Sequence, residues 1–174
     1  GLPLKKGRAA TMTHDYKRHG TTTLFAALDV KSGLVIGDCM PRHRAKEFLT
    51  FLRRIDRAVK APRDIHIVLD NYATHKTLEV KAWLEKHPRF KLHFTPTSAS
   101  WLNAVEGWFA QLERRALYRD AFSSVADLRA AIRRFIAAHN EHSAKPFRWN
   151  KTAEAIIGSV HRAKLAAIKH KFLD

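Results

Sequence analysis

The chain has 174 residues, of which 45% are hydrophobic, and this length and composition fit one globular domain with a sizeable core. It has no apolar run near the roughly 18 residues of a membrane-spanning helix and no signal-peptide layout, and its single cysteine, Cys39, excludes an internal disulfide and a cysteine-rich zinc site. The net charge of +16 is spread along the whole chain and is typical of a surface that follows a nucleic-acid backbone, rather than of a helix lying on an anionic membrane.

The first third of the chain predicts an arm, a β-hairpin and a helix. Residues 1–20 have turn residues and positive charge but no periodicity, and they are expected to form either a DNA-contacting arm or a frayed terminus that contains Lys5, Lys6 and Arg8. Residues 21–30 and 34–39 are β-prone and are separated by a Lys-Ser-Gly turn, which predicts a hairpin. Residues 44–59 predict a helix whose apolar face carries Phe48, Leu52, Ile55 and Val59.

A short apolar run then ends on a carboxylate. Ile65, Ile67, Val68 and Leu69 predict a strand buried on both faces, and Asp70 and Asn71 follow it directly. Open α/β sheets bind their ligands at the carboxyl ends of central strands, so Asp70 is a candidate site residue. The alternative is that Asp70 only begins a turn or caps the next helix.

Residues 75–87 predict a second helix, which Pro88 ends, and residues 90–94 predict a further strand. A third helix carries a second carboxylate, because Glu106 lies on the flank of an apolar stripe that repeats at three and four positions: Leu102, Val105, Phe109, Leu112 and Ala116. From there Glu106 can reach toward the end of a neighbouring strand. The alternative is an ordinary solvated helix glutamate.

The last third predicts two helices joined by a basic and aromatic loop. The first covers about residues 124–139, with Ser123 or Ser124 as the N-cap and Asp127 in the first turn. The loop covers residues 145–149, and Thr152 begins the last helix. A hairpin followed by alternating helices and strands predicts an α/β sandwich.

Two motifs resemble those of a known family. Leu69-Asp70-Asn71 followed by His75, and then Ser100-Trp101-Leu102-Asn103-Ala104-Val105-Glu106, are similar to the second and third acidic residues of DDE transposases. The branch they resemble is that of the bacterial insertion sequences related to the mariner elements. This family often has proline where Ala104 stands, and the resemblance runs from about Gly7 to Ile157.

The resemblance implies a ribonuclease H-like α/β fold, in which helices flank a mixed central sheet, with the first strand missing and extra C-terminal helices. It implies one catalytic domain over residues 1–174, divided into the arm (1–20), the ribonuclease H-like core (21–118) and the C-terminal helices (119–174). The family also has a separate helix-turn-helix DNA-binding part, which is expected to be absent here.

The resemblance further implies that Asp70 and Glu106 are catalytic residues and ligands of two Mg²⁺ or Mn²⁺ ions. The family's first acid precedes a stretch like the one at residues 2–7, and the chain begins with Gly1 rather than Met. We therefore expect a fragment that lacks this acid and is weakly active or inactive. Asp29 is a candidate replacement ligand, with a turn-initiating aspartate as the alternative, and Asp38 is a weaker candidate.

Other residues are candidates for supporting roles. Asn71 and Asn103 flank the two acids and could orient them or a scissile phosphate. His75 matches a family position and could face the site, with a structural histidine at a helix start as the alternative. Further candidate DNA contacts, for which a solvated basic face is the alternative, are Arg114, Arg115, Arg119, Lys145 and Arg148. Trp108 is expected in the core, and Trp101 stays open between core packing and base stacking. A zinc site that includes His66 and His93 has no supporting spacing.

The sequence is therefore interpreted as the catalytic domain of a bacterial DDE transposase that cleaves and joins DNA strands. Its expected partners are double-stranded element ends and target DNA, on which it forms a homodimer in the cytoplasm at the nucleoid. One alternative is a non-catalytic DNA-binding remnant or regulator of an active transposase. Another is a different ribonuclease H-like nuclease, such as a junction resolvase.

Overall fold

The structure is a computed structural model that describes residues 20–60, 62–95, 103–118 and 121–148, together with residues 152, 154, 155, 157–159 and 162. The predictions for the arm, including Lys5, Lys6 and Arg8, and those for Trp101, Arg119 and Trp149 lie outside the described residues. No helix in the described part is both long enough and apolar enough to cross a membrane.

A β-hairpin forms the centre of the fold. Strand β1 (Thr23–Leu28) pairs antiparallel with β2 (Val35–Met40), with Thr23 opposite Met40 and Leu28 opposite Val35. Alternate side chains point to opposite faces, so Phe25 enters one apolar cluster, whereas Leu24, Ala26 and Leu28 pack against another. An apolar cluster therefore covers each face of the hairpin.

The first cluster joins the hairpin to two helices and a parallel strand pair. Helix α1 (Ala45–Ala58) buries Phe48, Leu52 and Ile55 as the periodicity predicts. Strand β3 (Ile65–Leu69) pairs in parallel with β4 (Phe90–Phe94), with Ile65 opposite Phe90, and helix α2 (Leu78–Glu85) connects them. Ile65, Leu69 and Phe90 face this cluster together with Val80 and Trp83 of α2.

The helix predicted over residues 75–87 is wrong at its start. A 3₁₀ turn, η1 (Ala73–Lys76), precedes α2, and Thr77 separates the two with an extended backbone at ψ 158°. This break buries His75 at 7% exposure, while Leu78 at the start of α2 is 82% exposed. Burial of the His75 ring beside α1 thus prevails over one continuous amphipathic helix.

The second cluster lies on the other face of the hairpin. Helix α3 (Val105–Leu112) continues into a π-helix, η3 (Glu113–Leu117), and α4 (Val125–Ala138) continues into η4 (His139–Ser143). Val105, Trp108 and Leu112 pack with Ile132 against Val35, which confirms Trp108 as a core residue. The Ser124 Oγ accepts a hydrogen bond from the Asp127 N–H at 3.1 Å and confirms Ser124 as the N-cap.

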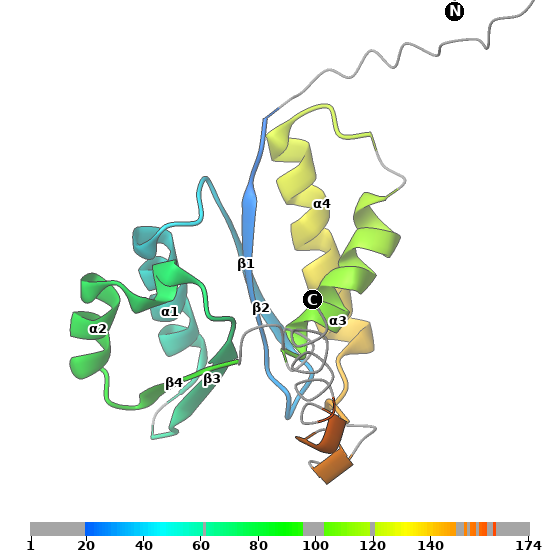
Figure 1. Cartoon of the computed structure of the whole chain (residues 1–174). Helices are drawn as coiled ribbons and strands as arrows, with labels where there is room; N and C mark the ends of the chain where they lie inside the picture. Colours follow the sequence, from blue (N-terminus) through cyan, green and yellow to red (C-terminus); the bar gives the residue numbers. More distant parts are fainter. Residues whose placement is uncertain are drawn as a thin grey trace, which may run out of the picture.

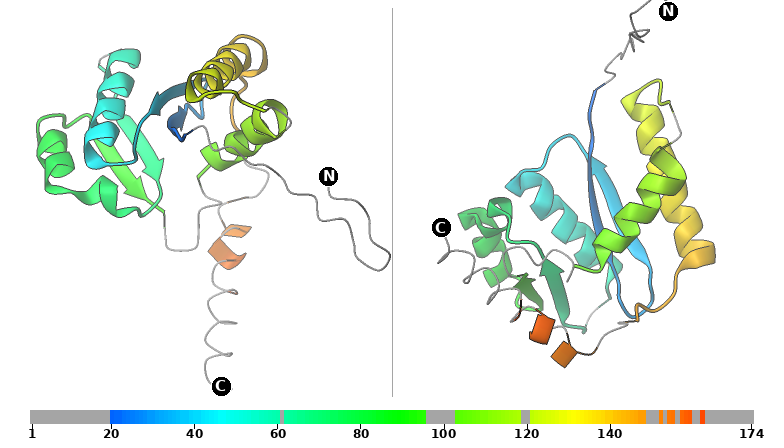
Figure 2. Two further views of the ribbon diagram at one scale, coloured as in Figure 1. Left: turned by 90° about the horizontal axis from the view of Figure 1, so that it is seen from above. Right: turned by 45° about the vertical axis from the view of Figure 1, so that its right-hand side comes forward.

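Helices therefore lie on both sides of the hairpin, with α1 and α2 on one side and α3 and α4 on the other (Figures 1 and 2). The fold is α/β, as predicted. The described strands form two separate two-stranded sheets, β1–β2 and β3–β4. Consequently each of the four strands, β1 and β3 included, has one edge without a strand partner among the described residues.

The prediction that the strand at residues 65–69 is buried on both faces is wrong. Ile65 and Leu69 are buried, but His66 is exposed and Val68 is 51% exposed. The reason is that α1 and α2 cover only one face of the β3–β4 pair. At the described positions after Thr152, the predicted last helix is confirmed, and the Ala155 N–H donates to Thr152 Oγ1 at 3.3 Å.

Candidate active site

Asp70 lies directly after the carboxyl end of β3 and is exposed. The last residue of β3, Leu69, is still paired with the neighbouring chain, because its carbonyl accepts a hydrogen bond from the N–H of Thr95, directly after β4, at 2.9 Å. The Asp70 Oδ1 atom lies 3.2 Å from Nε2 of His75. This contact engages the Oδ1 atom of Asp70, and the rest of the carboxylate stays open to solvent.

His75 is held in a ring cluster. Its ring centroid lies 4.3 Å from that of Phe48 in α1, 5.9 Å from that of His43 and 6.1 Å from that of Tyr72. Burial lowers the pKa of His75 below its ordinary value, and the charge of His43 acts in the same direction, whereas Asp70 acts against it. A neutral imidazole with its hydrogen on Nε2 can donate to Asp70. The Nδ1 atom is buried and has no hydrogen-bond partner among the described residues.

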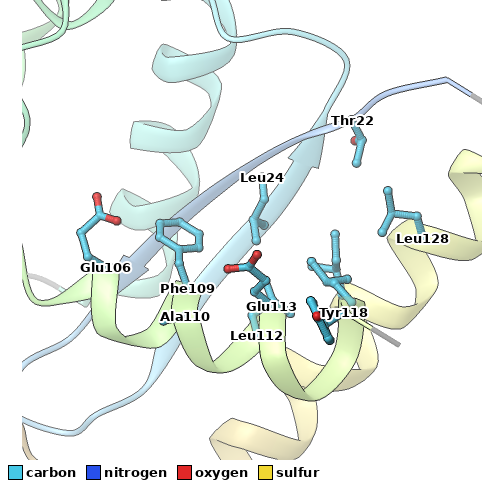
Figure 3. A pocket seen from close by; sticks show the side chains of 11 residues that line it. Thr22, Leu24, Glu106, Phe109, Ala110, Leu112, Glu113, Tyr118 and Leu128 are labelled. Atoms are coloured by element: carbon cyan, nitrogen blue, oxygen red, sulfur yellow. The ribbon is translucent and has the colours of Figure 1, made fainter. Parts of the chain in front are cut away.

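Glu106 occupies the first turn of α3, where its N–H donates to the Asn103 carbonyl at 3.0 Å. Its side chain is exposed and lies at one end of a groove of about 640 Å³ between β1, α3, η3 and α4 (Figure 3). The groove has a largely apolar lining that includes Leu24, Phe109, Leu112, Leu117, Leu128 and Ile132. Glu106 therefore lies on the border between buried and wet faces, as its helical position predicts.

A second glutamate, Glu113, lines the same groove, and its side chain points toward Leu24 of β1 (Figure 3). The motifs of the sequence do not point to it. The spacing of seven residues from Glu106 places both on one side of a helix, so that signal was present in the sequence. Glu113 lies outside the family motif, and it offers a matched comparison for Glu106.

Asp29 has a complete set of turn contacts. Its Oδ1 accepts from the Lys31 N–H at 2.9 Å and its Oδ2 accepts from the Ser32 hydroxyl at 2.6 Å. Partial burial acts to raise the pKa of the Asp29 carboxyl, but these hydrogen bonds outweigh it and the pKa is lowered. The geometry favours the turn-initiating alternative over a metal ligand. Asp38 is likewise engaged, by Arg54 at 3.1 Å.

The remaining candidates are placed as follows. Asn71 beside Asp70 is exposed, and Asn103 is half-buried and holds the start of α3 through its carbonyl. Arg114 is exposed, and its Nε donates to the Ala110 carbonyl at 3.1 Å. The other described basic candidates, Arg115, Lys145 and Arg148, are also exposed.

The donor chemistry fits a hard divalent cation in kind, because Asp70 and Glu106 offer carboxylate oxygens open to solvent. The set is incomplete in number, since the described residues contain no group of three or more His, Cys, Asp or Glu side chains arranged to hold a metal ion. Among the described residues, Asp70 and Glu106 are therefore candidate ligands only, and a complete site would need more donors.

Comparisons with known proteins bear on the family and the fold of the chain. The model of the family described as "DDE superfamily endonuclease" matches residues 2–129. A protein of Shigella sonnei named "Insertion element IS630 uncharacterized 39 kDa protein" is 28% identical over 89 residues, which are 51% of this chain and 26% of that protein. The crystal structure of the Mos1 strand transfer complex superposes with a TM-score of 0.58 at 20% identity, over 79% of this chain and 42% of that one.

Proposed function

This chain belongs to the DDE superfamily of endonucleases, in the branch that includes insertion element IS630 and mariner transposases, and we propose that it is a transposase catalytic domain that cuts and joins DNA with divalent metal ions. The chain spans about a quarter of the curated relative and under half of the similar solved structure. Its fold is ribonuclease H-like. The division into arm, core and C-terminal helices stays a prediction.

The observation that carries the proposal is the placement of the two motif acids. Asp70 follows the end of a strand and is held from behind by a buried histidine, and Glu106 stands at the end of a groove on the first turn of α3. We propose that Asp70 and Glu106 hold Mg²⁺ or Mn²⁺, and that Asn71 and Asn103 orient the acids or the scissile phosphate. When bound, such ions supply an activated nucleophile and stabilise the leaving oxygen in an in-line displacement at phosphorus.

His75 contributes through Asp70. A hydrogen bond from Nε2–H to Oδ1 fixes the orientation of the carboxylate and leaves Oδ2 for a ligand. Burial lowers the pKa of His75 and so favours the neutral ring, which adds no positive charge to repel a cation at the same carboxylate.

We propose that the first acid comes from an additional strand. The open edges of β1 and β3 have no strand partner among the described residues, and unpaired edges of this kind are normally covered. A strand at the edge of β1 would also border the groove that contains Glu106. Asp29, whose carboxylate oxygens bind within its own turn, is the less suitable source of the acid.

The proposed partner is double-stranded DNA, both element ends and target, bound by a homodimer in the bacterial cytoplasm. The support is the net charge of +16 and the exposure of Arg114, Arg115, Lys145 and Arg148. The proposal extends to Lys5, Lys6, Arg8 and Arg119, which lie outside the described residues.

The decisive experiment measures Mn²⁺-dependent nicking of DNA that carries the element's inverted repeats. A version extended upstream through one more strand is compared with its Asp70→Asn, Glu106→Gln and Glu113→Gln variants, and with the present chain. We expect nicking only by the extended protein and its Glu113→Gln variant, because Glu113 shares the groove with Glu106 but not the motif.

The alternative function is that of a DNA-binding remnant or regulator, which the positive charge alone would support. In that case the extended protein would bind the repeats in a salt-dependent manner without nicking them, and Asp70→Asn and Glu106→Gln would change nothing. Nicking of branched junctions in preference to inverted repeats would favour a resolvase.

A further inference from the structure

Two histidines meet on the face of the β3–β4 pair that α1 and α2 leave uncovered. His66 of β3 and His93 of β4 are both exposed, and the Nδ1 atom of His66 lies 2.9 Å from the Nε2 atom of His93. Their rings are stacked, with centroids 5.2 Å apart and planes inclined by 13°. The two residues come from strands in fixed parallel register, with His66 opposite Lys91 and Val68 opposite His93.

We propose that His66 and His93 form a bidentate site for a divalent transition-metal ion such as Cu²⁺ or Ni²⁺. Two nitrogens that each lie about 2.0–2.1 Å from one ion and subtend a right angle there are about 2.9 Å apart. The separation in the structure is the same, and right angles are the geometry of square-planar and octahedral ions. The two strands therefore keep their positions, and only the rings turn so that both lone pairs point at the ion.

The chemistry selects against the cations proposed for Asp70 and Glu106. Imidazole nitrogens suit Cu²⁺, Ni²⁺ and Zn²⁺, whereas Mg²⁺ prefers oxygen ligands. Asp64 does not join the pair as a third ligand, because the described residues contain no group of three His, Cys, Asp or Glu side chains placed to hold a metal ion, and the Asp64 carboxylate is paired with Lys91 Nζ at 2.6 Å. The remaining positions on the ion are therefore filled by water, which makes this an open site.

The hydrogen bond between the rings shows what binding requires. One of the two contacting nitrogens carries the hydrogen, whereas a metal needs the lone pairs of both. The ring that carries this hydrogen moves it to its other nitrogen, which solvent can reach because both rings are exposed. The exchange releases no net proton from a neutral pair.

A bound ion would link β3 to β4 just before Asp70. We therefore expect Cu²⁺ or Ni²⁺ to raise the melting temperature by a few degrees, because an ion that binds only the folded pairing stabilises it. This effect does not depend on catalysis, so the inference stands or fails independently of the proposed transposase activity.

The test uses untagged protein titrated with Cu²⁺ and followed by electron paramagnetic resonance, which counts the imidazole nitrogens bound to the ion. We expect one tight ion with two imidazoles, one imidazole in His66→Ala or His93→Ala, and a loss of affinity of about tenfold or more in each. His142→Ala is the matched control, because His142 is an exposed histidine on a different element, η4, where its side chain contacts Glu141. Excess Mg²⁺ and the Asp70→Asn substitution are expected to leave Cu²⁺ binding unchanged.

Circular dichroism shows whether the variants fold, and Ni²⁺ calorimetry repeats the comparison without redox chemistry. The proposal is overturned if the wild type and the His66→Ala/His93→Ala double variant bind Cu²⁺ and Ni²⁺ alike. It is equally overturned if His142→Ala alone removes the tight ion.

Discussion

The Nε2 atom of His75 lies 3.2 Å from Oδ1 of Asp70, and the two partners differ sharply in environment, since the His75 side chain is 8% exposed and that of Asp70 is 57% exposed. A buried neutral ring thus holds an exposed carboxylate at the end of β3. The packing of His75 and its contact with Asp70 can therefore be tested separately. A side chain of similar size without a donor keeps the packing and removes only the contact with Asp70.

His75→Leu replaces the imidazole in the ring cluster with an apolar side chain of similar size. We expect the free energy of unfolding to stay within about 1.5 kcal/mol of the wild type, because the substitution also removes the unpartnered Nδ1 atom. Metal-dependent nicking by the extended protein should fall about 10- to 100-fold. Urea unfolding and initial nicking rates measure the two effects.

His75→Gln provides the control, because its side-chain amide can donate near the position of Nε2. It should recover part of the nicking that His75→Leu loses. If the two variants lose nicking equally while both remain folded, the hydrogen bond to Asp70 does not position the carboxylate.

Gly33→Ala tests the junction between the hairpin turn and the C-terminal part. Gly33 has φ +77°, and a Cβ atom there would overlap the backbone of Lys145. We expect a loss of stability of about 2 kcal/mol or more, from the left-handed conformation together with the overlap. Gly107→Ala is the matched control: it lies in α3 with nothing within 4 Å of the added atom, and it should stabilise by about 0.5–1 kcal/mol. Equal effects in urea unfolding would contradict the structure.

Asn140 of η4 acts as a side-chain extension of the hairpin. Its Oδ1 accepts from the Val35 N–H at 2.8 Å, and its Nδ2 donates to the Val35 carbonyl at 2.9 Å. Val35 is 2% exposed, so Asn140→Ala leaves two buried backbone groups unpaired and should cost about 2–4 kcal/mol in urea unfolding. The exposed neighbour Glu141→Ala should change stability by less than about 0.5 kcal/mol, and a similar loss in both variants would refute the pairing.

Asp29→Asn tests the turn assignment through pH. The lowered pKa means that the folded state holds this proton less tightly than the unfolded chain does. The carboxylate therefore contributes stability above its ordinary pKa, and this contribution is lost as the pH falls through the lowered value. The difference in melting temperature between wild type and Asp29→Asn should be present near pH 6 and shrink below about pH 4. A difference that is unchanged across this range would show that the charge of Asp29 does not matter to the turn.

Much of the fold could be predicted because local patterns and packing agree. The hairpin, α1, β4 and the Ser124 cap follow from period, turn residues and capping chemistry, and the structure keeps them within one or two residues. Local patterns failed where a distant element decided the outcome. Burial of His75 beside Phe48 breaks the predicted helix at Thr77, and the limited cover from α1 and α2 leaves Val68 exposed.

The site was predictable to a different extent. The resemblance indicated Asp70 and Glu106 as candidates, and the seven-residue spacing places Glu113 on the same side of the helix as Glu106, but no pattern in the sequence shows that His75 contacts Asp70. The meeting of His66 and His93 depends on the β3–β4 register, across 27 positions of sequence, and such pairings come only from tertiary structure.

The most direct measurement of the central claim is Mn²⁺ binding to the extended protein, followed by electron paramagnetic resonance in a cycle of Asp70→Asn, Glu106→Gln and the double variant. If the two acids hold the same ions, each single substitution should remove most of the binding and the double variant should lose little more. Effects that simply add, or binding that survives in the double variant, would show that Asp70 and Glu106 do not share a metal site.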